Sequence, residues 1–331
     1  MRILVVGAGV SGLSCAIRLL ESGHRVTVAS VARTPNVTSD RSAAAFTPFR
    51  ASGDDRLATW TRRSFEVFNE LEQRLTRETG VRSLPMNEYY FEPFAGEPWW
   101  FSAVGGGKTL KRVPDRYEWG VRVRVPTIDM RRYMPWLEQR VSTLGGVFEK
   151  AHFSGVSSCF ERDVDAVVNT SGLGARELVP DVAMTPIRGQ IVSAPNNIAL
   201  RECFADSSQT GETTYVFPFE DRIVIGGTYE KGVEETTTDE TALALIVERG
   251  RTMLRESGHP RADDLALTLL STWAGLRPAR VIGTNNASIR VELEHWPDGR
   301  ALIHDYGHAG VGVTVSWGCA DEVVNLVESK R

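Results

Sequence analysis

The first thirty residues constrain the fold of this chain more than any other stretch. A short apolar run, Ile3 to Val6, is typical of a buried strand. It is followed by Gly7-Ala8-Gly9-Val10-Ser11-Gly12 and then by apolar residues at helical spacing, which end near Gly23. His24 to Val28 has the composition of a second strand. The predicted order is strand, glycine turn, helix and strand, the context in which a G-x-G-x-x-G pattern carries meaning.

This glycine turn predicts a site for the diphosphate of an adenine dinucleotide. Gly7 permits the tight turn, Gly9 has no Cβ to obstruct the diphosphate, and Gly12 lets the helix pack closely on the strand. The first N–H groups of that helix have no partner within the helix, and its dipole places partial positive charge there. The alternative is a glycine-rich turn without a ligand, which the two flanking strands disfavour.

One expected feature of a dinucleotide site is missing. An acidic residue usually ends the second strand and binds the ribose hydroxyls. Here that segment reads Val28-Ala29-Ser30-Val31-Ala32-Arg33. The ribose must therefore be bound differently, with Ser30 as one candidate and Arg33, placed at the phosphate, as another. The pattern alone does not distinguish FAD, NAD and NADP.

The composition is that of an ordinary globular protein. The 331 residues are enough for a large core and for two domains. A net charge of −4 argues against nucleic-acid or anionic-membrane partners. No apolar run approaches the roughly 18 residues of a membrane span. Because the N-terminus enters the first strand directly, we expect no signal peptide.

The cysteines indicate a reducing compartment. They are far apart and form no C-x-x-C pair, so we expect free thiols, with neither a disulfide framework nor a metal site. The four are Cys15, Cys159, Cys203 and Cys319. The chain ends in Ser-Lys-Arg rather than in a peroxisomal signal. We therefore expect a cytoplasmic protein.

Two segments after the second strand leave alternatives open. Ala43-Ala44-Ala45 either packs against a flat partner or begins a helix. Trp99 and Trp100 either line a pocket or, as we favour, serve buried packing or an oligomer contact. Amphipathic helices are predicted over 57–77 and 130–144.

Two later segments resemble parts of a nucleotide-binding sheet. Residues 166–172, AVVNTSG, predict a buried strand that ends in small polar residues, and ligands in open parallel sheets lie beyond such ends. Residues 301–306 predict another strand, followed by a glycine-rich turn and a helix from about Val313 to Glu328. The second glycine-fronted helix could stabilise partial negative charge, for example on a reduced flavin ring; the alternative is a turn that merely contains glycines.

Between these segments the pattern changes. Short β-rich runs at 187–192, 214–217 and 222–227, separated by turn signals, predict an antiparallel sheet. A helix over about 239–258 follows, and then 273–278, which reads as a strand or turn returning to the first domain.

Taken together, these residues resemble the D-amino-acid oxidase family of FAD-dependent enzymes, almost from end to end. The motifs that carry the resemblance are GAGVSGL, AAAFTPF, VVNTSG, RGQI, TYVFP with IGGTY, GLRPAR and IHDYGHAGVGVTVSWGCA. The resemblance implies an α/β fold, in which a Rossmann-type FAD-binding domain has an inserted antiparallel-sheet substrate domain. The expected FAD-binding segments are 1–50, 140–186 and 270–331, and the expected substrate-binding segments are 51–139 and 187–269.

The resemblance also implies roles for individual residues in binding FAD. The expected FAD ligands are Gly7, Ala8, Gly9, Val10, Ser11, Gly12, Thr38, Ser39, Ala43, Ala44, Ala45, Thr47, Ser171, Gly172, His308, Ala309, Gly310, Val311, Gly312, Val313 and Thr314.

For the substrate, Arg277 matches the arginine that binds the carboxylate, a role that suits a planar fork of donors. Tyr215 matches a tyrosine whose hydroxyl meets the same carboxylate, and Tyr229 a second pocket tyrosine of the fungal members; either could instead be strand core. Gly310 would accept the substrate amine through its backbone carbonyl. Animal members carry a lid tyrosine where this chain has Gly211, so we expect no aromatic lid of that type.

The activity that the resemblance implies is oxidative deamination of a D-amino acid, by hydride transfer from Cα to flavin N5. The products would be a 2-oxo acid, ammonia and, with dioxygen as acceptor, hydrogen peroxide. No histidine–carboxylate pair is evident around Arg277, and a hydride step from a neutral amine needs none. The enzyme could form a homodimer.

Other functions remain open at this stage. The chain could oxidise glycine, sarcosine, D-aspartate or an unusual amino compound on the same fold, or it could bind a flavin or NAD without turnover. An acidic substrate would need a second cation, for which Arg188 and Arg222 are candidates.

Overall fold

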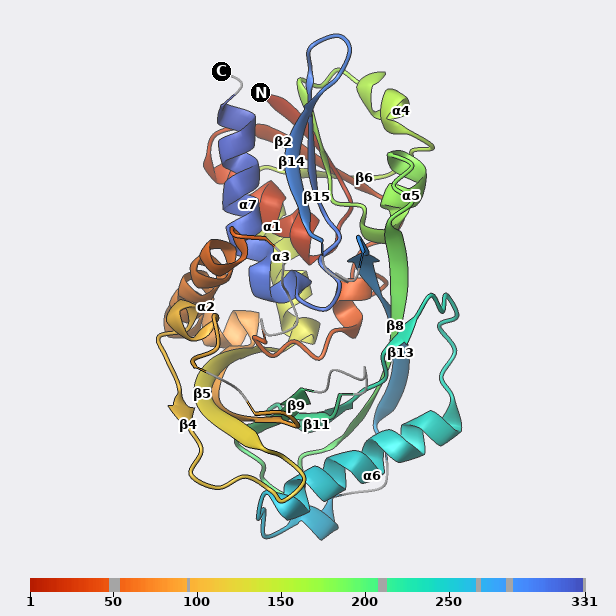
Figure 1. The fold of residues 1–331 in the computed structure, drawn as a ribbon. Helices are drawn as coiled ribbons and strands as arrows, with labels where there is room; N and C mark the ends of the chain where they lie inside the picture. The colour runs from red at the N-terminus through yellow and green to blue at the C-terminus, as the bar shows by residue number, and fades with distance from the viewer. Residues whose placement is uncertain (48–53, 94–95, 208–212, 266–268, 284–287, 330–331) are drawn as a thin grey trace.

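The computed structural model describes the chain except for residues 48–53, 94–95, 208–212, 266–268, 284–287 and 330–331. It contains two sheets, which lie one above the other in Figure 1. The upper, six-stranded sheet has the order β14-β15-β7-β1-β2-β6. Its strands are β1 (Arg2–Val6), β2 (Arg25–Ser30), β6 (Val147–Lys150), β7 (Ala166–Asn169), β14 (Arg290–His295) and β15 (Ala301–Tyr306).

The six-stranded sheet is parallel apart from β14, and helices cover both of its faces. Ile3 and Val5 on β1 share one buried cluster with α1 and α7, whereas Leu4 and Val6 share another with α4 and α5. This double burial explains why β1 is apolar without alternation. The helices are α1 (Val10–Glu21), α2 (Leu57–Thr79), α3 (Met130–Thr143), α4 (Val156–Phe160), α5 (Ala175–Leu178), α6 (Glu240–Glu256) and α7 (Gly312–Glu328).

The second sheet has nine strands. Eight of them follow the order β12-β8-β11-β10-β9-β3-β5-β4, and the ninth, β13, pairs with β8 outside this order. All its pairs are antiparallel except β3 with β9, which is parallel. Helix α6 packs on one face through residues such as Ile246, against Val216 and Ile225. The strands are β3 (Val81–Tyr90), β4 (Lys108–Thr109), β5 (Trp119–Ile128), β8 (Met184–Pro195), β9 (Cys203–Ser207), β10 (Tyr215–Pro218), β11 (Arg222–Gly226), β12 (Glu230–Lys231) and β13 (Ser271–Arg280).

The two-sheet α/β fold predicted from the sequence is confirmed, while the division into domains stays a prediction. In that division β8 crosses the boundary at residue 187, and β13 is grouped with the FAD-binding segments. In the structure β13 pairs with β8 over its whole length, from Ser271 with Ser193 to Arg280 with Met184. Strand β13 therefore belongs to the second sheet and reaches from it to the first.

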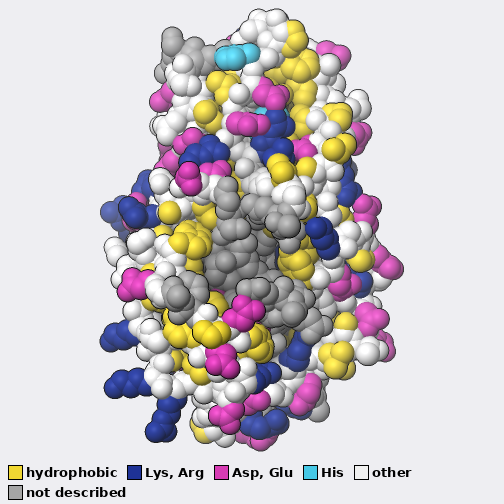
Figure 2. All heavy atoms as spheres, in the orientation of Figure 1, with side chains coloured by type: hydrophobic (Ala, Val, Ile, Leu, Met, Phe, Trp, Pro, Cys, Tyr) yellow, Lys and Arg dark blue, Asp and Glu magenta, His cyan; other side chains and the backbone are white. Residues whose placement is uncertain are grey.

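The surface charges and the cysteines match the composition of an ordinary globular protein with free thiols. Figure 2 shows acidic and basic side chains mixed over the visible face. All four cysteines are free and buried. None of the helices in the described ranges is long and apolar enough to cross a membrane.

Candidate functional site

A cavity of about 670 Å³ lies between the two sheets. Its upper wall is built at the carboxyl ends of β1, β2, β7 and β15, and its lower wall by β8, β9, β10 and β13. In an open parallel sheet the carboxyl ends of the strands are the edge at which ligands bind. The cavity lies within the usual size range of small-molecule and cofactor sites.

Backbone contacts at the first glycine turn explain its sequence. Gly7 has φ of +119°, and a Cβ there would lie 2.5 Å from the Thr170 carbonyl oxygen. A Cβ at Gly12 would lie 2.0 Å from the Gly7 oxygen, so Gly12 packs α1 on the turn and does not line the cavity. Gly9 does line it, and its added Cβ would meet only Ser39 Oγ, at 3.3 Å. The close packing expected of Gly12 is thus present, and the open space expected at Gly9 is present too.

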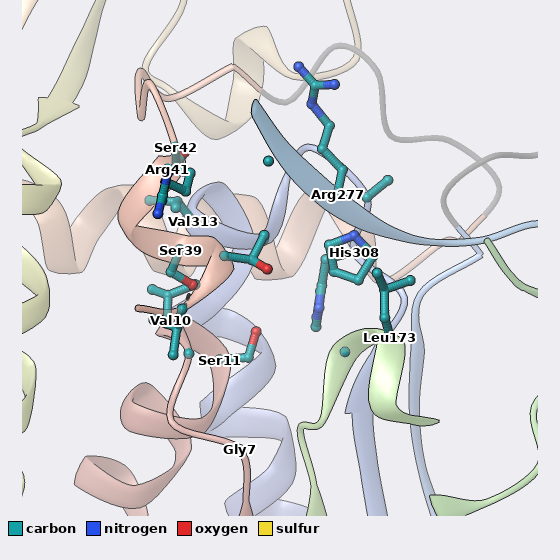
Figure 3. Close-up of a pocket in the computed structure, with 18 of the residues that line it drawn as sticks. Gly7, Val10, Ser11, Ser39, Arg41, Ser42, Leu173, Arg277, His308 and Val313 are labelled. Carbon is teal, nitrogen blue, oxygen red and sulfur yellow. Dashed lines mark hydrogen bonds between the residues drawn. The ribbon is translucent and has the colours of Figure 1, made fainter. Parts of the chain in front are cut away.

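The N-termini of two helices meet the cavity. Helix α1 begins at Val10, whose N–H donates to Ser39 Oγ at 2.9 Å (Figure 3). Helix α7 begins at Gly312, and residues 311–314 line the same cavity. Both ends present partly positive charge, which favours an anionic or polarised ligand.

The alanine run forms another part of the wall. Ala44 has φ of +43° and its carbonyl accepts the Ile128 N–H, while Ala45 bridges to Thr127. The alternative that this run begins a helix is therefore wrong. The small side chains of Ala43, Ala44 and Ala45 line the cavity, where they leave room for a flat ligand.

The structure separates the two candidates for binding the ribose. Ser30 lies at the end of β2 in the cavity wall, and its buried Oγ has no hydrogen-bond partner among the described residues. Arg33 instead donates to Glu138, with Nε and Nη2 at 3.0 and 2.7 Å from its oxygens, and stacks on Phe148. This geometry contradicts the placement of Arg33 at the phosphate and leaves Ser30, whose hydroxyl needs a partner.

Arg277 lies on β13, across the cavity from Val10 and Ser39 (Figure 3). Its Nη1 donates to the Thr228 carbonyl at 3.2 Å, and its guanidinium carbon lies 5.9 Å from the Tyr229 ring centre. Within the described part of the chain, Arg277 forms no ion pair with a carboxylate. A half-buried guanidinium in that state favours a bound anion.

Glycines on the neighbouring strands make room for the substrate-side residues. A Cβ at Gly189 would lie 2.3 Å from Nη1 and Nη2 of Arg277. A Cβ at Gly226 would lie 2.2 Å from the Tyr215 hydroxyl, and the Tyr215 ring stacks on Phe217 with centres 4.8 Å apart. In the sequence, Gly189 and Gly226 stand out only as members of the RGQI and IGGTY motifs. Their signal is a glycine inside a strand, which marks close approach of another group.

All the predicted site residues except Gly12 line this one cavity. The substrate residues among them are Tyr215, Tyr229, Arg277 and Gly310, and the FAD residues are Gly7, Ala8, Gly9, Val10, Ser11, Thr38, Ser39, Ala43, Ala44, Ala45, Thr47, Ser171, Gly172, His308, Ala309, Gly310, Val311, Gly312, Val313 and Thr314. Their individual roles stay predictions.

Other candidates lie outside the cavity. Arg188 pairs with Glu230, and Arg222 pairs with Asp129, so neither cation faces the site. Trp100 is buried, which fits the packing role that we favoured, and Trp99 is partly exposed. The expected lid position, Gly211, lies outside the described residues.

A histidine–carboxylate pair, which the sequence did not lead us to expect, does occupy the cavity wall. His308 Nε2 lies 2.9 Å from Asp305 Oδ1, and both residues are buried. Nearby, burial raises the pKa of Tyr306 to about 12, so its hydroxyl stays protonated and donates to Asp181.

The chain is similar in sequence to proteins of a known family over nearly its whole length. The family model described as FAD dependent oxidoreductase matches residues 2–326. A D-amino-acid oxidase of Streptomyces coelicolor is 36% identical over 326 residues, which cover 98% of this chain and 96% of that protein. A D-amino-acid oxidase of Rubrobacter xylanophilus is 38% identical over 329 residues, covering 98% and 95%.

Solved structures share the fold. Glycine oxidase from Bacillus cereus superposes with a TM-score of 0.75 at 17% identity and covers 100% of this chain and 95% of that one. L-proline dehydrogenase from P. horikoshii gives 0.75 at 12% identity, covering 99% and 93%. At these identities the likeness establishes the arrangement of the two sheets and no substrate.

The residues present fit FAD. The glycine turn leaves space beside Gly9 for a diphosphate, Ser30 offers an unsatisfied hydroxyl, and the two helix N-termini face the same space.

Gly9→Leu should therefore abolish FAD binding, because the new side chain would occupy the diphosphate position. Absorbance near 450 nm of the purified protein measures this loss. The control is Gly155→Leu, where an added Cβ meets nothing within 4 Å, and a yellow Gly9→Leu protein would contradict the assignment.

Proposed function

Since the chain belongs to the family of FAD-dependent oxidoreductases, we propose that it oxidises a D-amino acid at Cα. The imine product then hydrolyses to a 2-oxo acid and ammonia, and dioxygen is reduced to hydrogen peroxide. The resemblance to D-amino-acid oxidases inferred from the sequence is confirmed by relatives of that name over nearly the whole chain. We extend their activity to this chain on the basis of its cavity.

The observation that carries the proposal is the position of Arg277. Its guanidinium faces the cavity opposite the glycine turn, is supported by the Thr228 carbonyl, and has no carboxylate partner among the described side chains. A planar fork of donors binds a carboxylate in a fixed orientation. A bound amino acid would thus have its carboxylate directed away from the diphosphate site.

The chain's own residues would bind and orient the substrate. Arg277 would hold the carboxylate with help from the Tyr215 hydroxyl, and the Gly310 carbonyl would accept a hydrogen bond from the amine. With these two contacts fixed and the hydride acceptor on one side of Cα, only one enantiomer would direct its Cα–H at the acceptor, which is the basis of stereoselectivity. Phe217 and Ile191 give this end of the cavity an apolar wall that excludes water. FAD, when bound, supplies the hydride acceptor.

The cavity wall argues against an acidic side chain on the substrate. Arg188 and Arg222 are both committed to ion pairs elsewhere. The other arginine in the described wall, Arg41, lies beside Ser39 and Ser42 (Figure 3) and also packs against β13, where a Cβ added at Gly275 would lie 3.1 Å from Arg41 Cβ. We propose a neutral D-amino acid, and Arg41 is the residue that would instead favour D-aspartate if its guanidinium reached the substrate. A reducing compartment such as the cytoplasm would suit the four free thiols.

A panel of D- and L-amino acids, with glycine and sarcosine included, tests the proposal through peroxide formation. We expect neutral D-amino acids to give peroxide and their L-enantiomers to give almost none. Equal rates for D- and L-alanine would reject the stereochemical claim. Peroxide from glycine or sarcosine alone would favour an amine oxidase on the same fold, and a protein without flavin would favour a binding module.

Arg277→Ala should raise KM for the best substrate at least about 30-fold, since loss of a partly desolvated charge contact costs about 2 kcal/mol or more. FAD content should be unchanged, because Arg277 lies on the substrate side. Steady-state kinetics and the flavin absorbance measure the two effects. Arg124→Ala, which removes an exposed arginine from β5 in the same sheet, is the control. Wild-type KM in Arg277→Ala would show that the carboxylate binds elsewhere.

Gly189→Ala should lower kcat/KM by about 10- to 100-fold, because a displacement of the guanidinium by about 1 Å misaligns the substrate. The melting temperature should change little, since the added Cβ meets only the flexible end of Arg277. Gly155→Ala, with open space around its Cβ, controls for the loss of a glycine. Undiminished kcat/KM in Gly189→Ala would mean that the position of Arg277 does not limit turnover.

A further inference from the structure

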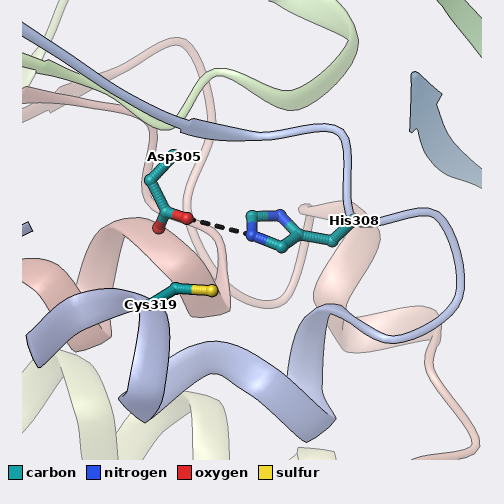
Figure 4. A group of neighbouring side chains, drawn as sticks. All are labelled: Asp305, His308 and Cys319. Atoms are coloured by element: carbon teal, nitrogen blue, oxygen red, sulfur yellow. Dashed lines mark hydrogen bonds and ion pairs between the residues drawn. The ribbon is translucent and has the colours of Figure 1, made fainter. Parts of the chain in front are cut away.

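Asp305, His308 and Cys15 form a buried hydrogen-bonded group beside the cavity. Asp305, at the end of β15, is fully buried and has both carboxylate oxygens engaged. Its Oδ1 lies 2.9 Å from His308 Nε2, and its Oδ2 accepts the Cys15 thiol at 3.2 Å. Figure 4 shows the His308 ring pointing directly at Asp305, with Cys319 beside them.

His308 belongs to the turn that joins β15 to α7, and this turn is conformationally strained. Gly307 has φ of +87°, which suits glycine, but Ala309 has φ of +48°, which a side chain disfavours. Strain of this kind persists only where surrounding contacts impose it, and it is concentrated at functional sites. The Asp305–His308 hydrogen bond is one such contact, since it fixes the side chain next to Ala309.

The same turn is attached to the strand that carries Arg277. The Ala309 N–H donates to the Pro278 carbonyl at 2.9 Å, and His308 forms a β-bridge with Ala279. A Cβ added at Gly310 would lie 3.6 Å from Arg277 Cδ. The turn therefore places the Gly310 backbone directly beside the carboxylate-binding arginine.

We propose that Asp305 is a positioning residue that acts through His308 to hold the turn Gly307–Gly310 in place. It thereby sets the distance between the Gly310 carbonyl, which receives the substrate amine, and Arg277, which receives the carboxylate. The inference rests on the proposed function, because it concerns how one amino acid is held at two points. Asp305 is fully buried and both of its oxygens are engaged, so its effect on the substrate would pass through the turn.

A metal ion is the competing explanation for this cluster. One donor atom each from Asp305, His308 and Cys319 lies within 4.8 Å of the others. However, His308 Nε2 is already hydrogen-bonded to Asp305 Oδ1. The other carboxylate oxygen, Oδ2, accepts a hydrogen bond from the Cys15 thiol. Burial also raises the pKa of the Cys319 thiol, which disfavours the thiolate that a metal binds. The two hydrogen bonds thus account for both Asp305 oxygens without a metal ion.

The experiment compares a ligand that uses both contacts with one that uses only Arg277. The probes are the D-amino acid that turns over fastest and its deaminated acid, which are D-alanine and propanoate in the simplest case. In Asp305→Leu we expect kcat/KM for D-alanine to fall by about 10-fold or more, as expected for misplaced contacts. The Kd of propanoate, measured by perturbation of the flavin spectrum, should change by less than about 3-fold because Arg277 itself is unmoved.

Asp305→Asn should restore activity close to wild type, because its amide oxygen can still accept the His308 N–H. Asp305→Ser, which is too short to reach His308, should behave like Asp305→Leu and serves in its place if the leucine variant does not fold. The control is Asp129→Leu, which removes another buried carboxylate, the partner of Arg222. It should lower the melting temperature and leave both kcat/KM for D-alanine and the Kd of propanoate close to their wild-type values.

Three outcomes would overturn the inference. Equal losses for D-alanine and propanoate in Asp305→Leu would indicate general damage, and unchanged kcat/KM would remove Asp305 from the site. One equivalent of zinc in the purified wild-type protein, lost in Asp305→Asn, would assign the cluster to a metal. A wild-type enzyme that turns over no D-amino acid while binding propanoate would instead refute the proposed function itself.

Discussion

The site depends on glycines, because a residue without a Cβ lets the backbone approach other groups closely. Gly7 and Gly12 bring β1, α1 and the β7 turn within contact distance, and this leaves Gly9 facing an open space. A diphosphate can approach such a turn closely and is stabilised there by unpaired N–H groups and the helix dipole. The second helix N-terminus, at Gly312, lines the same cavity.

The second sheet repeats the principle on the substrate side. Glycines at 189 and 226 interrupt strands that would otherwise carry side chains, and Arg277 and Tyr215 occupy the space they leave. The supported side chains lie flat over the sheet instead of extending freely into solvent, which lowers the entropy lost when a substrate binds. Strand β13 matters for a further reason, since it carries Arg277 and also contacts the turn at His308.

Local signals in the sequence predicted the main elements of the first sheet, and the family resemblance supplied most residues of the cavity wall. An apolar run followed by spaced glycines identifies β1 and α1, and the motif at 301–314 identifies β15 and α7. Contacts between distant segments leave no such signal. The Arg33–Glu138 pair, the Cys15–Asp305 hydrogen bond and the pairing of β13 with β8 each join residues whose proximity only the folded chain reveals. The missing acid after β2 was visible, but the unsatisfied Ser30 hydroxyl was not.

We infer that a carboxylate on Arg277 directs the substrate toward a cofactor held by the two glycine-fronted helices. A crystal structure of the FAD-bound protein with propanoate tests this inference most directly. We expect the carboxylate within hydrogen-bond distance of the Arg277 guanidinium, the Gly310 carbonyl beside the ligand, and the flavin between the ligand and the Gly7–Gly12 turn. Propanoate bound away from Arg277, or flavin bound outside the cavity between the two sheets, would contradict it.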